Sequence, residues 1–317
     1  MPLCAKLWQI IPFTPMFKQH PISYYEELLP KKHYLDIPIP QHLHQVFLGK
    51  RFKELPKEMQ DNIRYIQRLN PDWEYHFWGD DAIEAFILEA YTPDILRYFR
   101  LISPIYKAAQ SDFFRYLLMY HYGGVYMDIK ATMDRPLSKM ILPTDRYILY
   151  HWNNDAEGPY KGFGRYPDLP AEQYPYGEYP QGFIFCSPGH PLLRAILLEA
   201  MRRLDNYSPF REGVGLWGVL RTTGPIMYTQ TIEQTRPKLD PSTYRWLRCA
   251  EELGLQISIY ESDGAFAHRK KISTYHNQLS AVSLNGSECL TKLLYPAFFG
   301  WRILRILGDK IRQRLGR

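Results

Sequence analysis

The segment that most constrains the fold is SPIYKAAQSDFFRYLLMYHYGGVYMDIK, residues 103–130. Its opening serine and proline predict the first turn of a helix, and Gly123 and Gly124 predict the end of that helix and a sharp turn. The apolar residues that follow predict a short buried strand, which ends at Asp128. A helix that leads directly into a buried strand indicates an α/β fold, in which ligands bind beyond the carboxyl ends of the strands.

The rest of the chain also alternates between strand and helix patterns. Apolar, β-branched runs predict strands, and apolar residues three or four positions apart predict helices. We expect strands at 43–48, 73–79, 124–129, 146–152 and 181–187, and helices at 54–70, 80–91, 104–122 and 190–204. Residues 153–180 are rich in Tyr, Pro and Gly and show no period, which predicts a long loop of the kind that often carries function.

The composition is ordinary for a globular protein, with 45% hydrophobic and 23% charged residues among 317. The four cysteines, Cys4, Cys186, Cys249 and Cys289, form no C-x-x-C pair, which argues against a structural zinc site or a disulfide framework and favours a reducing compartment. No apolar run reaches the roughly 18 residues needed to cross a bilayer, and the N-terminus shows no signal-peptide cleavage site. We therefore expect a cytoplasmic protein.

The predicted helix before the strand carries Asp112 and Arg115, which are three residues apart and therefore share one face. A return of the chain through the two glycines would bring that face towards Asp128. Carboxylates and a guanidinium at a strand end suit a ligand with hydroxyl and phosphate groups. The alternative is a solvated ion pair of Asp112 and Arg115, worth ~0.3–0.5 kcal/mol, and the spacing alone leaves both interpretations open.

Four blocks of the sequence occur in an order that is found in a known family. They are IPQHLHQVFLG, NPDWEYHFWGDDAI, SDFFRYLLMYHYGGVYMDIKATMDRPL and TTGPIMYT. The sequence resembles the DXD-motif sugar transferases of glycosyltransferase family 32, which includes initiating α-1,6-mannosyltransferases and capsular polysaccharide glycosyltransferases. The resemblance implies a GT-A-like nucleotide-sugar-binding fold with a mixed central sheet flanked by helices. It also implies a retaining transfer from a UDP- or GDP-sugar to a glycan or lipid-linked acceptor.

The resemblance assigns the donor sugar to the residues already singled out. Asp112 and Arg115 would grip its hydroxyl groups, and Gly123 and Gly124 would let the backbone approach it closely. Asp128 would be the first acid of the D-x-D motif, near the ribose, the sugar and any metal ion.

The resemblance places the nucleotide and the diphosphate on other segments. Gln45 and Phe47 would line the nucleotide. His276 matches, more weakly, a C-terminal histidine that approaches the diphosphate in related enzymes, although a core or surface histidine would give the same pattern.

The second acid of the family motif, usually a metal ligand, is replaced by Lys130 in this chain. A charged lysine does not bind Mn²⁺ or Mg²⁺, but it can put a cation beside the leaving diphosphate, as the metal does. One interpretation is a metal-free site in which Asp128 and Lys130 are the catalytic pair. A second is that Lys130 points away and Asp128 with His276 holds Mn²⁺ or Mg²⁺. A third is an inactive site that only binds the nucleotide sugar.

A phosphatase of the haloacid-dehalogenase type is the competing interpretation from another class. The run VYMDIKAT resembles its motif, a buried strand that ends in an acid followed two residues later by a second acid and then a threonine. That chemistry needs the second acid as a proton donor, and Lys130 replaces it. The transferase interpretation is therefore favoured.

The excess positive charge lies at the C-terminal end. Residues 290–317 hold seven Lys or Arg and one Asp, and so the whole net charge of +6, whereas residues 1–289 are neutral. Apolar residues recur every three or four positions from Trp301, which predicts a basic amphipathic helix. We expect a transferase domain at 1–289 and a tail that binds an anionic membrane surface peripherally, with a helix docked on the domain as the alternative. Nucleic acid is not expected, because the neutral domain offers no basic groove.

Overall fold

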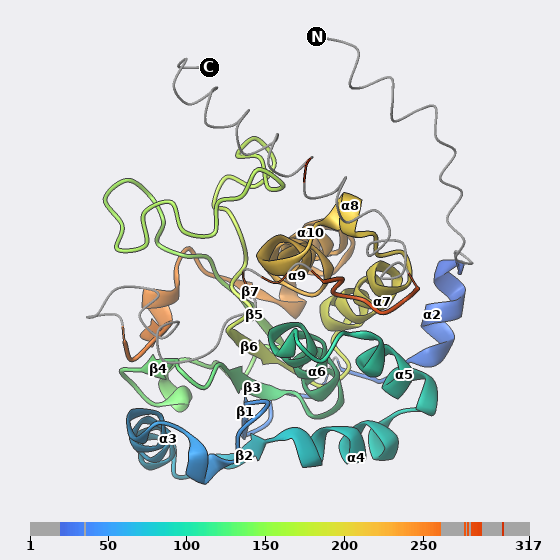
Figure 1. Ribbon diagram of the computed structural model, residues 1–317. Helices are drawn as coiled ribbons and strands as arrows, with labels where there is room; N and C mark the ends of the chain where they lie inside the picture. The colour runs from blue at the N-terminus through green and yellow to red at the C-terminus, as the bar shows by residue number, and fades with distance from the viewer. Residues whose placement is uncertain are drawn as a thin grey trace.

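The computed structural model describes residues 20–34, 36–260, 276, 278, 280–286 and 300, and shows a central sheet flanked by helices (Figure 1). The strands are β1 (His42–Val46), β2 (Glu74–Trp78), β3 (Gly124–Met127), β4 (Thr132–Met133), β5 (Tyr147–Leu149), β6 (Phe183–Cys186), β7 (Arg245–Trp246) and β8 (Leu255–Gln256). The helices are α2 (Ile22–Leu28), α3 (Lys57–Leu69), α4 (Asp80–Ala90), α5 (Pro93–Leu101), α6 (Lys107–Tyr122), α7 (Pro191–Asp205), α8 (Pro209–Glu212), α9 (Gly215–Thr222) and α10 (Pro225–Thr235).

The predicted amphipathic helix of residues 290–317 lies outside the described residues, apart from Gly300. That helix and the domain boundary at residue 289 therefore stay predictions. Among the described residues, no helix combines the length and the apolar character that crossing a membrane requires.

The central sheet is mixed, as expected. Its six strands run in the order β2-β1-β3-β6-β5-β7. Strand β1 is parallel to both of its neighbours, whereas β6 is antiparallel to β3 and to β5. Because β2, β1 and β3 are parallel, their carboxyl ends meet at one edge of the sheet. Asp128 follows β3 at this edge.

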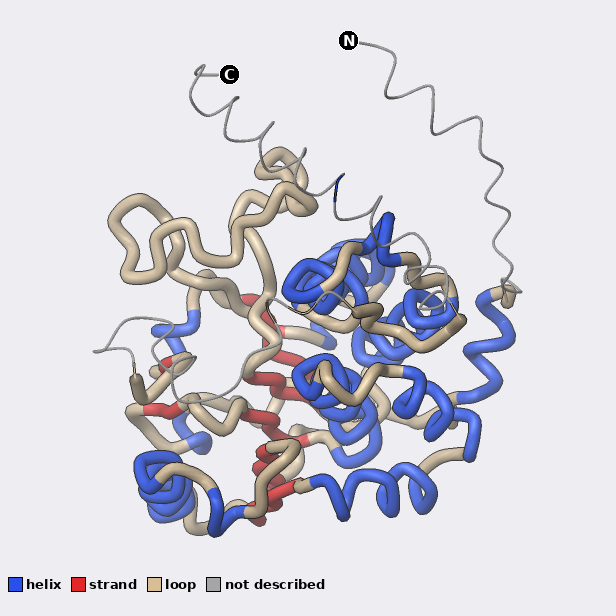
Figure 2. The backbone as a smooth tube through the Cα atoms, in the orientation of Figure 1, coloured by secondary structure: helices blue, strands red, loops and turns tan. Residues whose placement is uncertain are grey.

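The sheet separates two apolar layers, because successive side chains of a strand point to opposite faces. In β3, Tyr126 packs into the larger core, which includes residues of α5, α6, α7 and α10. Val125 and Met127 pack on the other face, with residues of α3 and of the β4–β8 ribbon. Figure 2 shows the same arrangement, with most of the helices on one side of the strands.

The helix before β3 begins later than predicted. Helix α6 starts at Lys107, with Tyr106 as its N-cap, rather than at the Ser-Pro pair. The backbone N–H of Ser103 donates instead to the carbonyl of Val282, at 2.8 Å. Ser103, which the local sequence predicts as the N-cap, thus pairs with a segment that is distant in the sequence.

Gly123 and Gly124 form the predicted turn between α6 and β3. Their φ angles are +67° and +91°, values that residues with a Cβ rarely adopt. A Cβ on Gly123 would lie 2.6 Å from the backbone nitrogen of Pro188, and one on Gly124 would lie 2.4 Å from the carbonyl oxygen of His42. The turn therefore needs glycine for its dihedral angles and for the space around it.

The long loop is confirmed. Residues 150–182 join β5 to β6 without a helix or a strand. Asn154 holds its arms together, because its side-chain amide donates to the carbonyls of Phe163 at 2.8 Å and Tyr176 at 3.1 Å.

We predict that Gly124→Ala destabilises the protein by more than about 2 kcal/mol, because the added Cβ strains the backbone and overlaps the carbonyl of His42. Gly162→Ala is the matched control. Its φ is +71°, but nothing lies within 4 Å of the added Cβ, so only a backbone cost of roughly 1–2 kcal/mol applies. Urea unfolding measures both variants. An equal loss of stability in the two would contradict the close backbone approach at Gly124.

Candidate active site

An open cleft of about 780 Å³ lies at the carboxyl ends of β1 and β3. Its walls come from the segment after β1, the first half of α6, the end of β3 and the turn before β6. The charged and polar side chains on its lining are those of Lys50, Lys107, Ser111, Asp112, Arg115, Tyr126, Asp128, Lys130, Gln181, His276 and Gln278. The fold thus brings the four charged residues that the sequence singled out into one cleft.

Arg115 is the centre of the polar network in this cleft. Its buried guanidinium places Nη2 2.9 Å from Asp112 Oδ1 and Nη1 3.2 Å from Asp128 Oδ1, and Nη1 also donates to the carbonyl of Gln181 at 2.8 Å. The ring of Tyr126 lies beside the guanidinium, 4.5 Å from Cζ to the ring centroid. The interpretation of Asp112 and Arg115 as a solvated surface pair is therefore wrong.

Both carboxylate oxygens of Asp128 are engaged. Oδ1 accepts from the hydroxyl of Tyr126 at 2.9 Å as well as from Arg115, and Oδ2 accepts from Lys130 Nζ at 2.6 Å. Burial by itself would raise the pKa of Asp128, but the charges of Lys130 and Arg115 outweigh it and lower the pKa to about 2. Asp128 is therefore ionised at every pH at which the protein would work.

Asp112 occupies the other side of the guanidinium. Its Oδ1 accepts from Gln181 Nε2 at 3.0 Å, and its Oδ2 accepts from the hydroxyl of Thr223 at 3.2 Å. Burial raises the pKa of Asp112 to about 6 against the opposing charge of Arg115, and the negative charge of Asp128 adds to the rise. The pKa values of the two acids therefore lie on opposite sides of the usual carboxyl range.

The charged groups in this cleft do not fit a divalent metal ion. Lys130 points at Asp128, not away from it, so the cationic Nζ lies where the second metal ligand would be. The oxygens of Asp112 are occupied by Arg115, Gln181 and Thr223. Mn²⁺ and Mg²⁺ prefer several oxygen ligands in octahedral geometry, and Asp128 would not supply them even with an imidazole from His276.

His276 lies on the cleft lining, as the resemblance implies. Its carbonyl accepts from the backbone N–H of Leu216 at 3.3 Å, which fixes the backbone at this point. Residues 261–275 and 277 lie outside the described residues, so the role of the His276 side chain stays a prediction.

Gln45 and Phe47 differ in their relation to the cleft. Phe47 is part of the lining, as predicted, but Gln45 is buried beneath it. Gln45 Nε2 donates to the backbone carbonyl of Asp128 at 3.3 Å, and its Oε1 accepts from the hydroxyl of Tyr75 at 2.9 Å. Gln45 therefore supports the backbone of Asp128 and does not line the cleft.

The assignment of Gly123 and Gly124 to the donor sugar needs a correction. Both residues lie at the amino end of β3, whereas Asp128 follows its carboxyl end. Neither glycine is part of the cleft lining, and both lie against backbone atoms of Cys186, Pro188 and His42. They shape the α6–β3 turn that presents Arg115 to Asp128.

A second groove of about 550 Å³ shares Asp128, Lys130 and Gln181 with the cleft and extends under the long loop. Its lining includes Glu178, a buried carboxyl group. Glu178 Oε1 accepts from Trp152 Nε1 at 2.6 Å, but its Oε2 has no hydrogen-bond partner in the structure. Burial raises the pKa of Glu178 to about 7.

Four site residues were not singled out from the sequence: Tyr126, Glu178, Gln181 and Thr223. Tyr126 and Thr223 lie within the blocks that carry the family resemblance, which was the available signal. Gln181 and Glu178 lie in or beside the long loop, where no periodic pattern marks them.

The comparisons with known proteins identify the family of this chain. Residues 56–148 match a family described as "Glycosyltransferase sugar-binding region containing DXD motif". Inositol phosphoceramide mannosyltransferase 2 of Schizosaccharomyces pombe is 33% identical over 285 residues, which cover 87% of this chain and 71% of that protein. The chain belongs to this glycosyltransferase family. Asp128, Ile129 and Lys130 lie within the matched residues.

Other relatives match over shorter stretches. The initiation-specific alpha-1,6-mannosyltransferase of Candida albicans is 28% identical over 211 residues, which cover 62% of this chain and 52% of that protein. Inositol phosphoceramide mannosyltransferase 1 of S. pombe is 33% identical over 123 residues, which cover 35% of this chain and 36% of that protein. The chain thus spans about half the length of these relatives or less. Among solved structures, the PaToxG glycosyltransferase has a TM-score of 0.45 and 19% identity, and the match covers 69% of this chain and 75% of that one.

Family membership also decides against the phosphatase interpretation. The relatives named above are sugar transferases. In addition, the acid that a haloacid-dehalogenase-type phosphatase needs two residues after Asp128 is a lysine that pairs with Asp128.

We predict that Glu178 makes the folded protein less stable as the pH rises from about 4.5 to about 7. In this window the unfolded chain loses the proton of Glu178, whereas the folded state, in which burial raises the pKa to about 7, still binds it. Glu178→Gln should therefore flatten the pH profile and be more stable than the wild type at pH 8, by on the order of 2–3 kcal/mol.

Urea unfolding at pH 5 and pH 8 tests this effect. The control is Glu172→Gln, an exposed glutamate of the same loop, which should leave the profile unchanged. A Glu178→Gln profile that is parallel to the wild-type profile would show that the buried carboxyl group does not hold its proton.

Proposed function

We propose that the protein is a retaining glycosyltransferase that moves a sugar from a nucleotide-sugar donor to a glycan or lipid-linked acceptor. The observation that carries the proposal is the network of buried Asp112 and Arg115 with half-buried Asp128 and Lys130 in an open cleft, in a member of the DXD glycosyltransferase family. The network holds two cations and two anions, so it offers both donors and acceptors to sugar hydroxyl groups without a large net charge.

The shape of the cleft supports a donor in an extended pose. Phe47 and Leu48 give its rim apolar surface for a nucleoside, while Asp112, Arg115 and Asp128 lie at its base for the sugar. The lining also carries Lys50, Lys107 and Lys130, whose ammonium groups suit a diphosphate.

Lys130 has a specific role in this proposal. In the structure it neutralises Asp128, and in the complex its ammonium group would turn partly to the bridging diphosphate as negative charge develops there. The sugar–oxygen bond of the donor breaks, the acceptor oxygen forms the new bond to the same sugar carbon, and the acceptor proton passes to the departing phosphate. A fixed cation at the leaving group stabilises this transition state without a metal ion.

The second groove offers a place for the acceptor. It meets the cleft at Asp128, Lys130 and Gln181 and is lined by aromatic residues, among them Trp152, Phe163 and Tyr166. Aromatic faces of this kind pack against sugar rings. The names of the relatives point to mannose as the donor sugar and to an inositol phosphoceramide as one class of acceptor.

A lipid acceptor would agree with a peripheral position on a membrane. The basic tail at 290–317 is the candidate for that contact, and this part of the proposal rests on the sequence alone. The alternative function is an inactive module that binds a nucleotide sugar without transferring it.

We predict that a nucleotide sugar binds without a metal ion, and that Asp128→Asn and Arg115→Lys each weaken this binding at least about tenfold. Asn removes the charge that Arg115 and Lys130 need, and Lys cannot contact Asp112, Asp128 and the Gln181 carbonyl at once. Calorimetric titration with GDP-mannose, UDP-glucose and UDP-galactose in EDTA measures the affinities. Circular dichroism and thermal melting confirm that each variant is folded. Binding by none of the three donors would leave the proposal without support.

We predict that transfer persists in EDTA and that Lys130→Ala lowers kcat by about 10²-fold or more, because it removes the cation at the leaving group. Lys139→Ala, at an exposed lysine that lines neither the cleft nor the second groove, is the control and should keep full activity. The assay follows release of the nucleoside diphosphate with a mannosyl donor and a glycolipid acceptor. Complete and reversible loss of wild-type activity in EDTA would overturn the metal-free mechanism. Tight donor binding without any transfer would favour the binding module.

A further inference from the structure

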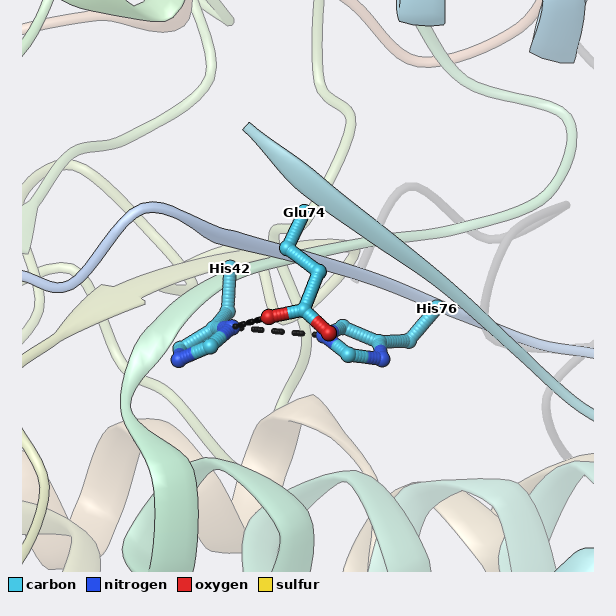
Figure 3. A group of neighbouring side chains, drawn as sticks. All are labelled: His42, Glu74 and His76. Atoms are coloured by element: carbon cyan, nitrogen blue, oxygen red, sulfur yellow. Dashed lines mark hydrogen bonds and ion pairs between the residues drawn. The ribbon is translucent and has the colours of Figure 1, made fainter. Parts of the chain in front are cut away.

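A second polar cluster lies far from the candidate active site, at the amino ends of β1 and β2. The two strands are parallel and in register, with His42 opposite Glu74 and His44 opposite His76. Because side chains alternate along a strand, Glu74 and His76 point to the same face of the sheet, and His42 on the neighbouring strand shares that face. Three side chains that commonly bind metals thus meet on one surface (Figure 3).

The contact atoms of this cluster converge on a single point. His42 Nδ1 lies 3.2 Å from Glu74 Oε2 and 3.2 Å from His76 Nε2, and His76 Nε2 lies 3.6 Å from Glu74 Oε1. With metal–ligand bonds of ~2.0–2.1 Å, neighbouring ligands of a tetrahedral ion lie ~3.3–3.4 Å apart. The two nitrogens lie 3.2 Å apart, close to one edge of such a tetrahedron, and one ligand atom from each of the three residues lies within 4.8 Å of the others.

Without an ion, each neutral histidine can donate its one proton to a different oxygen of Glu74. The two protonated nitrogens of His42 and His76 then face one another at 3.2 Å. A cation at the centre is attracted by all three groups at once. The choice of donors, two imidazoles and one carboxylate, suits Zn²⁺ and not Mg²⁺.

The surroundings hold the two imidazole rings in place and leave the cluster accessible. The ring of His44 stacks on that of His76, with centroids 4.8 Å apart, and the ring of Tyr122 is nearly parallel to that of His76. The side chains of His42 and His76 are 31% and 27% exposed, and that of Glu74 is 65% exposed. An ion at this point would reach solvent, so water could complete its coordination.

We propose that His42, Glu74 and His76 form a binding site for one Zn²⁺ ion, with the fourth position open to solvent. The site would join the edge strand β2 to β1 at the end of the sheet opposite to Asp128. It does not depend on the proposed transferase function, because none of its ligands lines the donor cleft. A bridge between two strands stabilises the folded state, since the unfolded chain does not hold the three ligands together.

The test is metal binding by the whole protein after treatment with EDTA and removal of the chelator. Calorimetric titration with ZnCl₂, and elemental analysis after gel filtration, should show one Zn²⁺ per chain and no comparable binding of Mg²⁺. Thermal melting should show a rise in Tm of roughly 5 °C or more when free Zn²⁺ exceeds Kd a hundredfold.

Three variants identify the ligands: His42→Asn, Glu74→Gln and His76→Asn. Each should weaken Zn²⁺ binding at least about tenfold and abolish the rise in Tm, since even the loss of an outer partner of a metal ligand costs 10–100-fold in affinity. Glu74→Gln is the variant least able to disturb the fold, because Glu74 is the most exposed of the three. The melting curves without zinc show that each variant is folded.

The matched control is His33→Asn. His33 also pairs with a carboxylate, Asp36, at 3.0 Å, but it belongs to no described group of three ligands, so this variant should bind Zn²⁺ like the wild type. Unchanged Zn²⁺ affinity in His42→Asn and His76→Asn would overturn the proposal and place the metal elsewhere in the chain. Failure of the wild type to bind Zn²⁺ would overturn it as well.

Discussion

The structure around the cleft depends on the guanidinium of Arg115, which is buried between Asp112, Asp128 and the carbonyl of Gln181. A buried guanidinium is costly unless its hydrogen-bonding groups are satisfied, and here three segments satisfy it: α6, the end of β3 and the turn before β6. Removal of one partner from such a network leaves an unpaired buried charge, which costs about 3–5 kcal/mol. The same contacts that shape the cleft therefore also hold the helix, the sheet and the long loop together.

Lys130, at the position where the sequence pattern would place a second acid, sets the electrostatics of the site. With a second carboxylate, the cleft would concentrate negative charge and would need a cation before it could accept a diphosphate. With Lys130, the two anions and two cations balance one another, and the pKa of Asp128 falls to about 2 without any ion. The lysine also stays next to Asp128 through a contact of 2.6 Å, so the cation is part of the protein and is not lost to a chelator.

Strand β1 connects two polar regions of the molecule. At its amino end His42 belongs to the proposed zinc cluster, and near its carboxyl end Gln45 supports the backbone of Asp128. The two side chains point to opposite faces of the sheet, because they are three residues apart on a strand. Because β1 is short, a displacement of this strand would move both polar regions.

The sequence by itself determined most of the local helices and strands of this protein, and it singled out Asp112 and Asp128 as the acids of the candidate site. The apolar period predicted α3, α4, α7 and the strands of the sheet other than β7, because long periodic segments bury one face wherever they pack. The spacing of Asp112 and Arg115, and the turn at Gly123 and Gly124, also predicted that the three charged side chains would meet. The helices α5, α9 and α10 were missed, since the Pro and Gly residues at their starts resemble loop signals.

Only the tertiary structure decided what depends on contacts between distant segments. Helix α6 begins at Lys107, and Ser103, the predicted N-cap, pairs through its N–H with Val282, which lies far away in the sequence. The long loop brings Glu178 and Gln181 to the site, and the end of α9 brings Thr223. No periodic pattern in the sequence relates these segments to Asp128. Gln45 turns out to support the site from below, and His42 meets Glu74 and His76 only because two parallel strands pair in one register. The physical reason is the same in each case: local propensity specifies the shape of a segment, whereas long-range hydrogen bonds and burial specify which segments become neighbours.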